Sequence, residues 1–258
     1  MILKHYILRT LKEPINFIML ILFPAVMITI MTVAANNNFV GDAHIINDFN
    51  SIATGNTTFN AIFFMFFSGM IVTDYLYLEF RTDMRWRLMA SPIPFSKFVA
   101  SAVGASMIVS VVNTVIVLAF GRFVLDAYLH NIFMTSAVLL TMGIFVTLIG
   151  VLCFMLIPKK GTTTAVMMAF AFLQLLPINF NMISTERGIL GAANFVPIMA
   201  AGQAMFYSGN MWVRFESGVL AHVYDADMGR ALIHLGILVG YTVIVAVAVA
   251  IVGRTRKI

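Results

Sequence analysis

The stretch that decides the fold is IFMTSAVLLTMGIFVTLIGVLCFMLI, residues 132–157, in which no side chain carries a charge. A helix needs about 20 consecutive apolar residues to cross the hydrocarbon core of a bilayer, so this stretch alone predicts a membrane span. Of the 258 residues, 61% are apolar and 10% are charged, and the mean hydropathy is +0.96. Soluble domains contain roughly 45–50% apolar and about 25% charged residues. The composition therefore predicts an all-α membrane protein and excludes a soluble enzyme.

Five further apolar runs are long enough to be spans. We predict six transmembrane helices, at residues 15–35, 59–78, 98–120, 132–157, 162–180 and 231–252. The first two should be joined by a polar outer loop over 36–59, which contains the sequon Asn56-Thr57-Thr58. A seventh apolar stretch, 188–206, is rich in Gly and Ala and is interrupted by Pro197.

The distribution of basic residues decides between six and seven spans. With six spans, twelve Lys and Arg residues fall on one side and four on the other; the four are Arg122, Arg187, Arg214 and Arg230. Positive residues concentrate on the cytoplasmic side of membrane proteins, so both termini should be cytoplasmic. A seventh span would place Arg254, Arg256 and Lys257 outside. Residues 188–206 are therefore predicted to form a re-entrant or interfacial element, because irregular backbone at membrane depth survives only where protein or water covers it. The basic charge thus reflects topology and does not indicate nucleic-acid binding.

The first thirteen residues form a separate amphipathic element that ends at Pro14. Apolar side chains recur at i, i+4 and i+8 on one face of a helix, and basic side chains lie on the other face. This pattern predicts a short helix at the cytoplasmic surface of the membrane. Its residues are Leu3, Lys4, Ile7, Arg9, Leu11 and Lys12. Two roles stay open for it: a membrane anchor, or a lever beside a cytoplasmic partner.

The segment between the second and third spans mixes both charge signs with large apolar side chains, and Pro92 and Pro94 close it. Aromatic and Arg side chains dominate the binding energy of protein interfaces, so a short helix carrying Trp86 between Arg85 and Arg87 favours a docking surface. The alternative is a helix that lies on lipid. The candidate docking residues are Glu79, Arg81, Asp83, Met84, Arg85, Trp86, Arg87, Leu88, Ser91 and Pro92.

Several kinds of chemistry are absent from the sequence. No glycine is followed by lysine, so the chain has no P-loop for nucleotide phosphates, and it has neither a zinc-protease nor a nucleophile-elbow motif. Ionisable residues are nearly absent from the spans, which disfavours an ion-coupled carrier. We therefore expect no enzymatic activity from this chain alone, no bound cofactor and no metal. A transporter of this kind needs an energy-supplying partner.

At residues 79–97 the sequence resembles the permease subunits of ATP-binding-cassette exporters that move drugs, polysaccharides, lipids and peptides. The resemblance rests on Lys12-Glu13-Pro14, on Pro24, on Arg87-Leu88-Met89-Ala90-Ser91-Pro92, which matches the family's Arg-Leu-x-x-Ser-Pro signature, and on Pro197. The Gly-Lys pair that the family tends to carry after this signature is replaced by Ala100-Ser101.

The resemblance implies that residues 1–258 form one permease domain and that this domain lies in the cell membrane of a bacterium. It implies a second permease subunit, identical or homologous, and two cytoplasmic ATPase subunits that bind ATP and Mg. Residues 79–92 would be the coupling helix that docks on the ATPase, residues 1–13 the interfacial helix, and the connection between spans five and six would contain re-entrant outer helices.

A substrate path is harder to place. Phe63 and Phe67 lie one turn apart in the second span and could line an apolar route, and Asn113 and Gln174 are the most polar groups at depth. Packing between helices is the alternative role for each. An apolar path favours amphipathic or hydrophobic cargo such as a peptide, a drug or a lipid. An ion-coupled transporter and a non-transporting scaffold or sensor remain as alternative functions. Gly236 and Gly240 form a G-x-x-x-G pair that permits close helix packing, within the chain or between subunits.

Overall fold

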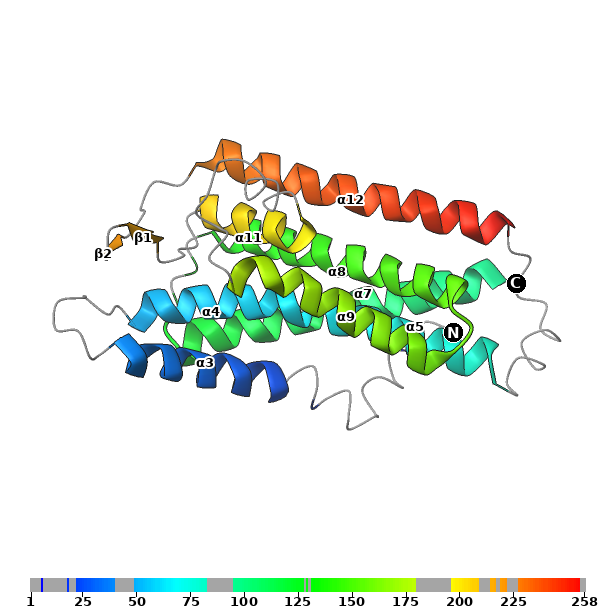
Figure 1. Cartoon of the computed structure of the whole chain (residues 1–258), viewed down its shortest axis with the longest axis horizontal. Coiled ribbons are helices and arrows are strands. Elements are labelled where there is room, and N and C mark those ends of the chain that lie inside the picture. Colours follow the sequence, from blue (N-terminus) through cyan, green and yellow to red (C-terminus); the bar gives the residue numbers. More distant parts are fainter. Residues whose placement is uncertain are drawn as a thin grey trace.

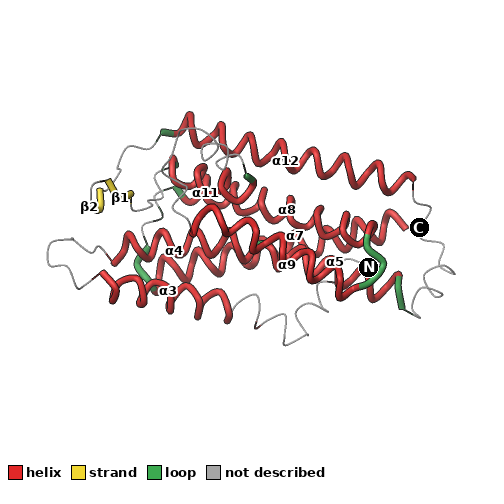
Figure 2. The backbone as a smooth tube through the Cα atoms, in the orientation of Figure 1, coloured by secondary structure: helices red, strands yellow, loops and turns green. Residues whose placement is uncertain are grey.

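The computed structural model describes residues 6, 18, 22–39, 49–82, 95–127, 129, 131–179, 196–208, 214–216, 219–221 and 227–255. These residues form a bundle of helices with one small hairpin at an end (Figures 1 and 2). The helices are α3 (Phe23–Phe39), α4 (Phe49–Phe64), α5 (Phe66–Phe80), α7 (Phe95–Val124), α8 (Ile132–Leu156), α9 (Lys160–Asn179), α11 (Pro197–Tyr207) and α12 (Met228–Thr255). The strands are β1 (Arg214–Glu216) and β2 (Val219–Ala221), which pair antiparallel.

Four helices within the described residues are long and apolar enough to cross a membrane. They are Asn60–Phe80, Lys97–Val124, Ile132–Leu156 and Met228–Arg254. The shorter helix Phe23–Ala34 is also apolar. The described residues are thus mainly helical, as expected from composition, and these apolar helices are compatible with a multi-pass membrane protein.

The long helices run side by side and their ends gather at two places (Figure 1). We call one place the basal end: α5, α8 and α12 end there, and α7 and α9 begin there. At the distal end α3, α7 and α9 end, and α4, α8 and α12 begin. Successive long helices therefore run in opposite directions. The β1–β2 hairpin lies at the distal end (Figure 2).

The prediction of a polar loop over residues 36–59 is wrong at both ends of that range. Helix α3 continues through Asn38 to Phe39, and α4 already begins at Phe49, so the sequon Asn56-Thr57-Thr58 lies inside a helix. Thr57 and Thr58 are buried. The Thr58 hydroxyl donates to the Thr54 carbonyl at 2.8 Å. Threonine can satisfy its hydroxyl on the preceding turn in this way, as Thr58 does. The Thr57 hydroxyl, in contrast, has no hydrogen-bond partner among the described residues.

Helices α4 and α5 adjoin at Met65, whose backbone keeps right-handed helical dihedrals (φ −60°, ψ −23°), so the second predicted span continues through this residue. The Met65 N–H is shared between the carbonyls of Ala61 and Ile62, each at 3.3 Å. The Ser68 hydroxyl donates to the Met65 carbonyl at 2.6 Å. Side chains that enter the backbone ladder in this way mark a local change of helix geometry.

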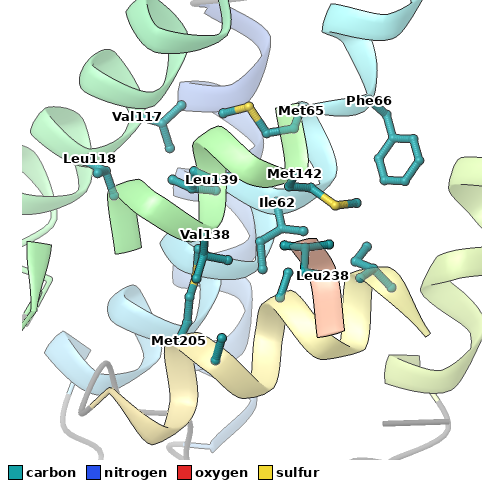
Figure 3. Close-up of a cluster of buried hydrophobic side chains, with 14 of the residues drawn as sticks. Ile62, Met65, Phe66, Val117, Leu118, Val138, Leu139, Met142, Met205 and Leu238 are labelled. Atoms are coloured by element: carbon teal, nitrogen blue, oxygen red, sulfur yellow. The ribbon is translucent and has the colours of Figure 1, made fainter. Parts of the chain in front are cut away.

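The main core lies where α4, α5, α7, α8, α11 and α12 meet (Figure 3). Side chains from these helices interlock there, among them Ile62, Met65, Val117, Leu139, Met142, Met205 and Leu238. Since lipid is as apolar as these side chains, their close packing and not the hydrophobic effect stabilises such a core within a membrane.

Helices α5 and α8 approach closely through glycines. A Cβ added at Gly69 would lie 2.6 Å from the carbonyl oxygen of Val146, and one at Gly150 would meet the carbonyl oxygen of Gly69. Small residues at such positions allow two helix backbones to touch. Beside them, the Ser106 hydroxyl on α7 donates to the Ser68 carbonyl at 2.7 Å and lies 3.2 Å from the Thr147 hydroxyl on α8.

The apolar stretch expected at 188–206 contributes α11. Pro197 is the first residue of this helix, where its missing N–H is not needed, so it begins an element and does not break one. Ile198, Met199, Ala201, Ala204 and Met205 are buried. Helix α11 is too short to cross a bilayer and packs mainly on α12 and α8 at the distal end (Figure 1).

Candidate functional site: the base of helix α5

Residues 74–81, the last two turns of α5 and the residue that follows, contact more separate elements than a helix end requires. We call this stretch the α5 base. It touches α7, α8 and α9 and also Tyr6 from the N-terminal segment, through hydrogen bonds, an ion pair and ring contacts. The stretch immediately after it is the charged segment singled out in the sequence.

Tyr77 connects the α5 base to the turn between α8 and α9. Its hydroxyl donates to the Ile157 carbonyl and lies 2.6 Å from the Thr163 hydroxyl. Its ring meets Phe154 of α8 edge-on, with centroids 5.1 Å apart. Tyrosine suits such a place because an apolar ring ends in a polar group. Two helices are thereby attached to α5 through one side chain.

Charged groups add further contacts at the α5 base. The Asp74 carboxylate lies 3.2 Å from the Lys160 ammonium at the start of α9, with both side chains about half exposed. The Arg81 guanidinium lies 5.8 Å from the centre of the Phe154 ring, within cation–π range. The ring of Phe80 contacts both Phe98 of α7 and Phe154.

Tyr6 and Glu79 form a buried pair. Tyr6 is fully buried and Glu79 is 7% exposed. The Tyr6 hydroxyl donates a hydrogen bond to the Glu79 carboxylate. The Tyr6 ring lies 5.1 Å from the ring of Tyr75, whose hydroxyl reaches the Tyr6 carbonyl at 3.4 Å. A buried carboxylate requires a hydrogen-bond donor, and Tyr6 supplies one.

The two ends of the bundle differ in charge. The described basic residues at the basal end are Arg81, Lys97, Lys159, Lys160 and Arg254; those at the distal end are Arg122, Arg214 and Arg230. Asp126, Glu216 and Asp227 lie at the distal end. The basic excess expected on one side is thus visible in the described part of the chain.

The structure describes two of the predicted docking residues, and they lie in different surroundings. The Glu79 carboxylate faces into the chain, whereas Arg81 is exposed. The remaining predicted docking residues lie outside the described residues: Asp83, Met84, Arg85, Trp86, Arg87, Leu88, Ser91 and Pro92. The predicted residues of the interfacial helix also lie outside them: Leu3, Lys4, Ile7, Arg9, Leu11 and Lys12. Tyr6, Tyr75 and Tyr77 also belong to this site, although the sequence alone did not indicate them. Their signal was a set of tyrosines near the ends of apolar runs.

The two phenylalanines proposed for a substrate path do meet. The rings of Phe63 and Phe67 lie 6.4 Å apart, on either side of Met65. Phe63 also contacts Phe172 of α9 at 6.3 Å, and Phe67 contacts Phe23 of α3 at 6.4 Å. Phe63 and Phe67 are half-buried and Phe172 is 58% exposed, while Phe64 and Phe66 are buried. The result is an aromatic patch, Phe23, Phe63, Phe67 and Phe172, across α3, α4, α5 and α9.

Asn113 is buried in α7, and its side-chain carbonyl oxygen has no hydrogen-bond partner among the described residues. It therefore does not join helices of the described chain by a hydrogen bond at this oxygen. The side chain of Gln174 lies outside the described part of the structure. Gly236 and Gly240 face away from the described helices, because a Cβ added at either would meet nothing within 4 Å.

Within the described part of the chain, no three His, Cys, Asp or Glu side chains come together as a metal site would need. Comparison with known proteins found no family model that matches this chain and no match among curated proteins.

Proposed function

We propose that this chain is the membrane-spanning subunit of an ATP-binding-cassette exporter. It would pair with a second permease and with two cytoplasmic ATPase subunits, which bind ATP and Mg and supply the energy. The cargo would be amphipathic or hydrophobic: a peptide, a drug or a lipid. In this proposal the chain has six spans, both termini are cytoplasmic, and the basal end faces the cytoplasm of the cell.

The observation that carries the proposal is the arrangement of the α5 base. A transporter without its own P-loop needs one place where force from a partner enters the membrane domain. The α5 base directly precedes the charged, Trp-containing segment and contacts α7, α8, α9 and Tyr6. A displacement of the segment would therefore reach three helices and the N-terminal segment at once.

The direction of the helices supports six spans. Successive long helices alternate in direction, and the basic residues of the described chain are more numerous at the basal end. Cytoplasmic faces carry the excess of Lys and Arg. Helix α11 supports a re-entrant element, because it is buried against α8 and α12 at the distal end yet is too short to span.

The aromatic patch supports an apolar cargo. Phe63, Phe67 and Phe172 present aromatic faces that are partly exposed along the bundle, next to Met65. Phenylalanine offers contact without a hydrogen-bonding requirement, which suits a variable apolar ligand. Asn113 and Gln174 would be the polar groups nearest to such a path.

The decisive experiment is affinity purification of the full chain from its own host, followed by identification of bound proteins and by transport assays in proteoliposomes. We expect an ATPase with a P-loop to copurify and transport to require ATP. Transport by the chain alone, driven by an ion gradient, would overturn the proposal. So would an ATPase-free chain without transport, as expected of a scaffold or sensor.

Charge-reversal variants locate the docking surface. Arg85→Glu with Arg87→Glu, and separately Trp86→Ala, should reduce ATPase binding and uncouple ATP hydrolysis from transport. The matched control is Arg214→Glu in the distal hairpin, which should leave both properties unchanged. Unchanged substrate-stimulated ATPase activity in the first variants would refute the docking assignment.

A further inference from the structure

One narrow stripe of the second span is open to its surroundings. Between positions 61 and 79 every residue is buried except Phe63, Phe67, Met70, Asp74 and Leu78. These positions follow one another at spacings of three and four residues, so they share one face of α4 and α5. We call this face the α5 stripe. It consists of four apolar side chains and one carboxylate.

Helix α9 runs along the α5 stripe in the opposite direction (Figure 1). Near the basal end the Lys160 ammonium of α9 lies 3.2 Å from the Asp74 carboxylate. Further along, the ring of Phe172 lies 6.3 Å from that of Phe63 and is 58% exposed. The stripe therefore has a charged end and an aromatic end, and α9 adds one side chain to each.

The Asp74 carboxylate is within reach of a ligand. A carboxylate in a membrane span is costly unless it has a partner, and Lys160 is that partner. Both side chains are about half exposed, and exposed ion pairs contribute little to stability, so another cation can replace the lysine at small cost. Glu79, the other described carboxylate at this end, is buried and accepts a hydrogen bond from Tyr6.

The aromatic end suits the same kind of ligand. At the rise of an α-helix, Phe67 lies about 10 Å and Phe63 about 16 Å along the axis from Asp74. Phenylalanine rings accept apolar groups, and their faces also attract cations. A ligand with a positive charge and an apolar body of this length matches both ends at once.

We propose that the α5 stripe binds lipophilic cations. The positive group of the ligand takes the place of Lys160 at Asp74, and the apolar body lies over Met70, Phe67 and Phe172. The inference rests on the proposed function in treating this ligand as cargo, and it narrows the cargo to cationic amphipathic molecules. Anionic lipids and acidic peptides do not fit, because Asp74 repels them.

The alternative is that the ion pair only links α5 to α9, and two variants separate the ideas. Asp74→Asn and Lys160→Gln remove the same ion pair, so a structural link predicts the same effect for both. A cation site predicts opposite effects on binding, because the first variant removes the attracting group and the second removes the competitor. Asp126→Asn is the matched control, since it neutralises an exposed carboxylate at the distal end.

The test measures equilibrium binding of tetraphenylphosphonium to the full chain in phosphatidylcholine nanodiscs, with protein-free nanodiscs as the blank. We expect saturable binding that Asp74→Asn weakens by about two- to fivefold and Lys160→Gln strengthens by about twofold, the range of exposed ion pairs. Asp126→Asn should change nothing. Tetraphenylborate, an anion of the same shape, should not bind saturably to the wild-type chain.

A second pair of variants tests the aromatic end. Phe172→Leu keeps an apolar side chain and removes the ring, so it should weaken phosphonium binding by about threefold. Phe133→Leu is the control, because Phe133 is 91% exposed at the distal start of α8. Equal effects of the two variants would remove Phe172 from the site.

Changes of the same sign in Asp74→Asn and Lys160→Gln, or no change in either, would overturn the cation site. Absence of saturable phosphonium binding, or equal binding of the borate, would do so as well. The proposed function is judged separately. If the phosphonium binds with the expected signs but no ATPase copurifies, the exporter proposal fails and the binding site stands. ATP-driven transport of a neutral or anionic cargo, without phosphonium binding, would have the reverse meaning.

Discussion

The carbonyl oxygen of Gly69 on α5 lies against Gly150 on α8, so that a Cβ at position 150 would collide with it. Position 69 is equally crowded, with the Val146 carbonyl oxygen 2.6 Å and the Met167 methyl 2.7 Å from an added Cβ. Backbone atoms cannot move aside as a flexible side chain can. The two helices are therefore fixed at a separation that only glycine permits.

Alanine at these glycines should destabilise the protein. We expect Gly69→Ala and Gly150→Ala each to lower the free energy of unfolding by about 1–3 kcal/mol, the usual cost of overpacking a well-packed core. Thermal unfolding in detergent measures the effect. Gly240→Ala is the control: its Cβ enters open space, and alanine favours a helix over glycine by about 1 kcal/mol. Equal effects at all three positions would contradict the close contact of α5 with α8.

Removal of the Tyr77 hydroxyl should also destabilise the basal end. Tyr77→Phe removes the donor to the Ile157 carbonyl, while the Thr163 hydroxyl keeps its hydrogen bond to the Lys159 carbonyl at 3.3 Å. An unsatisfied buried polar group costs about 1–3 kcal/mol. Thermal unfolding of Tyr77→Phe is compared with that of Tyr241→Phe, because the Tyr241 ring packs on Phe145 and its hydroxyl makes no hydrogen bond within the described residues. A wild-type midpoint for Tyr77→Phe would show that the turn between α8 and α9 does not depend on α5.

Asn113→Leu should raise the free energy of unfolding, in contrast to the substitutions above. The buried oxygen of Asn113 has no partner within the described residues, and a leucine of similar size removes the cost of burying it, about 1–3 kcal/mol. We expect a raised midpoint of thermal unfolding for the isolated chain. A lowered midpoint would mean that the amide does bind a group, and titration with cargo would then identify whether that group belongs to a ligand.

Among the aromatic residues of the second apolar run, we expect some to matter for stability and others for transport. Phe66 is 1% exposed, and Phe66→Ala should cost about 3–5 kcal/mol of stability. Phe63→Ala and Phe67→Ala should cost less and reduce transport of apolar cargo. Phe133, 91% exposed at the start of α8, provides the control Phe133→Ala. Transport that falls only in proportion to lost stability would exclude Phe63 and Phe67 from the path.

Periodicity and composition predicted the helices well, because a run of apolar residues has few alternatives in a bilayer. The span predicted at 132–157 is α8, Ile132–Leu156, almost to the residue. The predicted spans 98–120 and 231–252 are shorter than α7 and α12, since helices extend past the apolar run into polar surroundings. Arg122 illustrates this: it lies inside α7, and its guanidinium donates to the Ala127 carbonyl at 3.2 Å.

The site was less predictable, because its residues come from distant parts of the chain. Tyr6 and Glu79 are 73 positions apart, and nothing in their local sequence pairs them. The hydrophobic pattern also could not reveal that Asn36 to Asn38 stay helical, since asparagine is a poor helix former on its own. Helix α3 packs against α4, and tertiary packing of this kind routinely overrides helix propensity. By contrast, the apolar pattern was enough to bring Phe63 and Phe67 to one face.

The junction at Met65 has a consequence for packing. Helix α4 packs on α3, α7 and α11, whereas α5 packs mainly on α8, α7 and α9. The two helices thus share α7 and otherwise contact different partners, and they meet at a residue whose N–H is shared by two carbonyls. A disturbance in α4 therefore reaches α3 and α11 directly, one in α5 reaches α8 and α9, and the rings of Phe63 and Phe67 lie on either side of the junction.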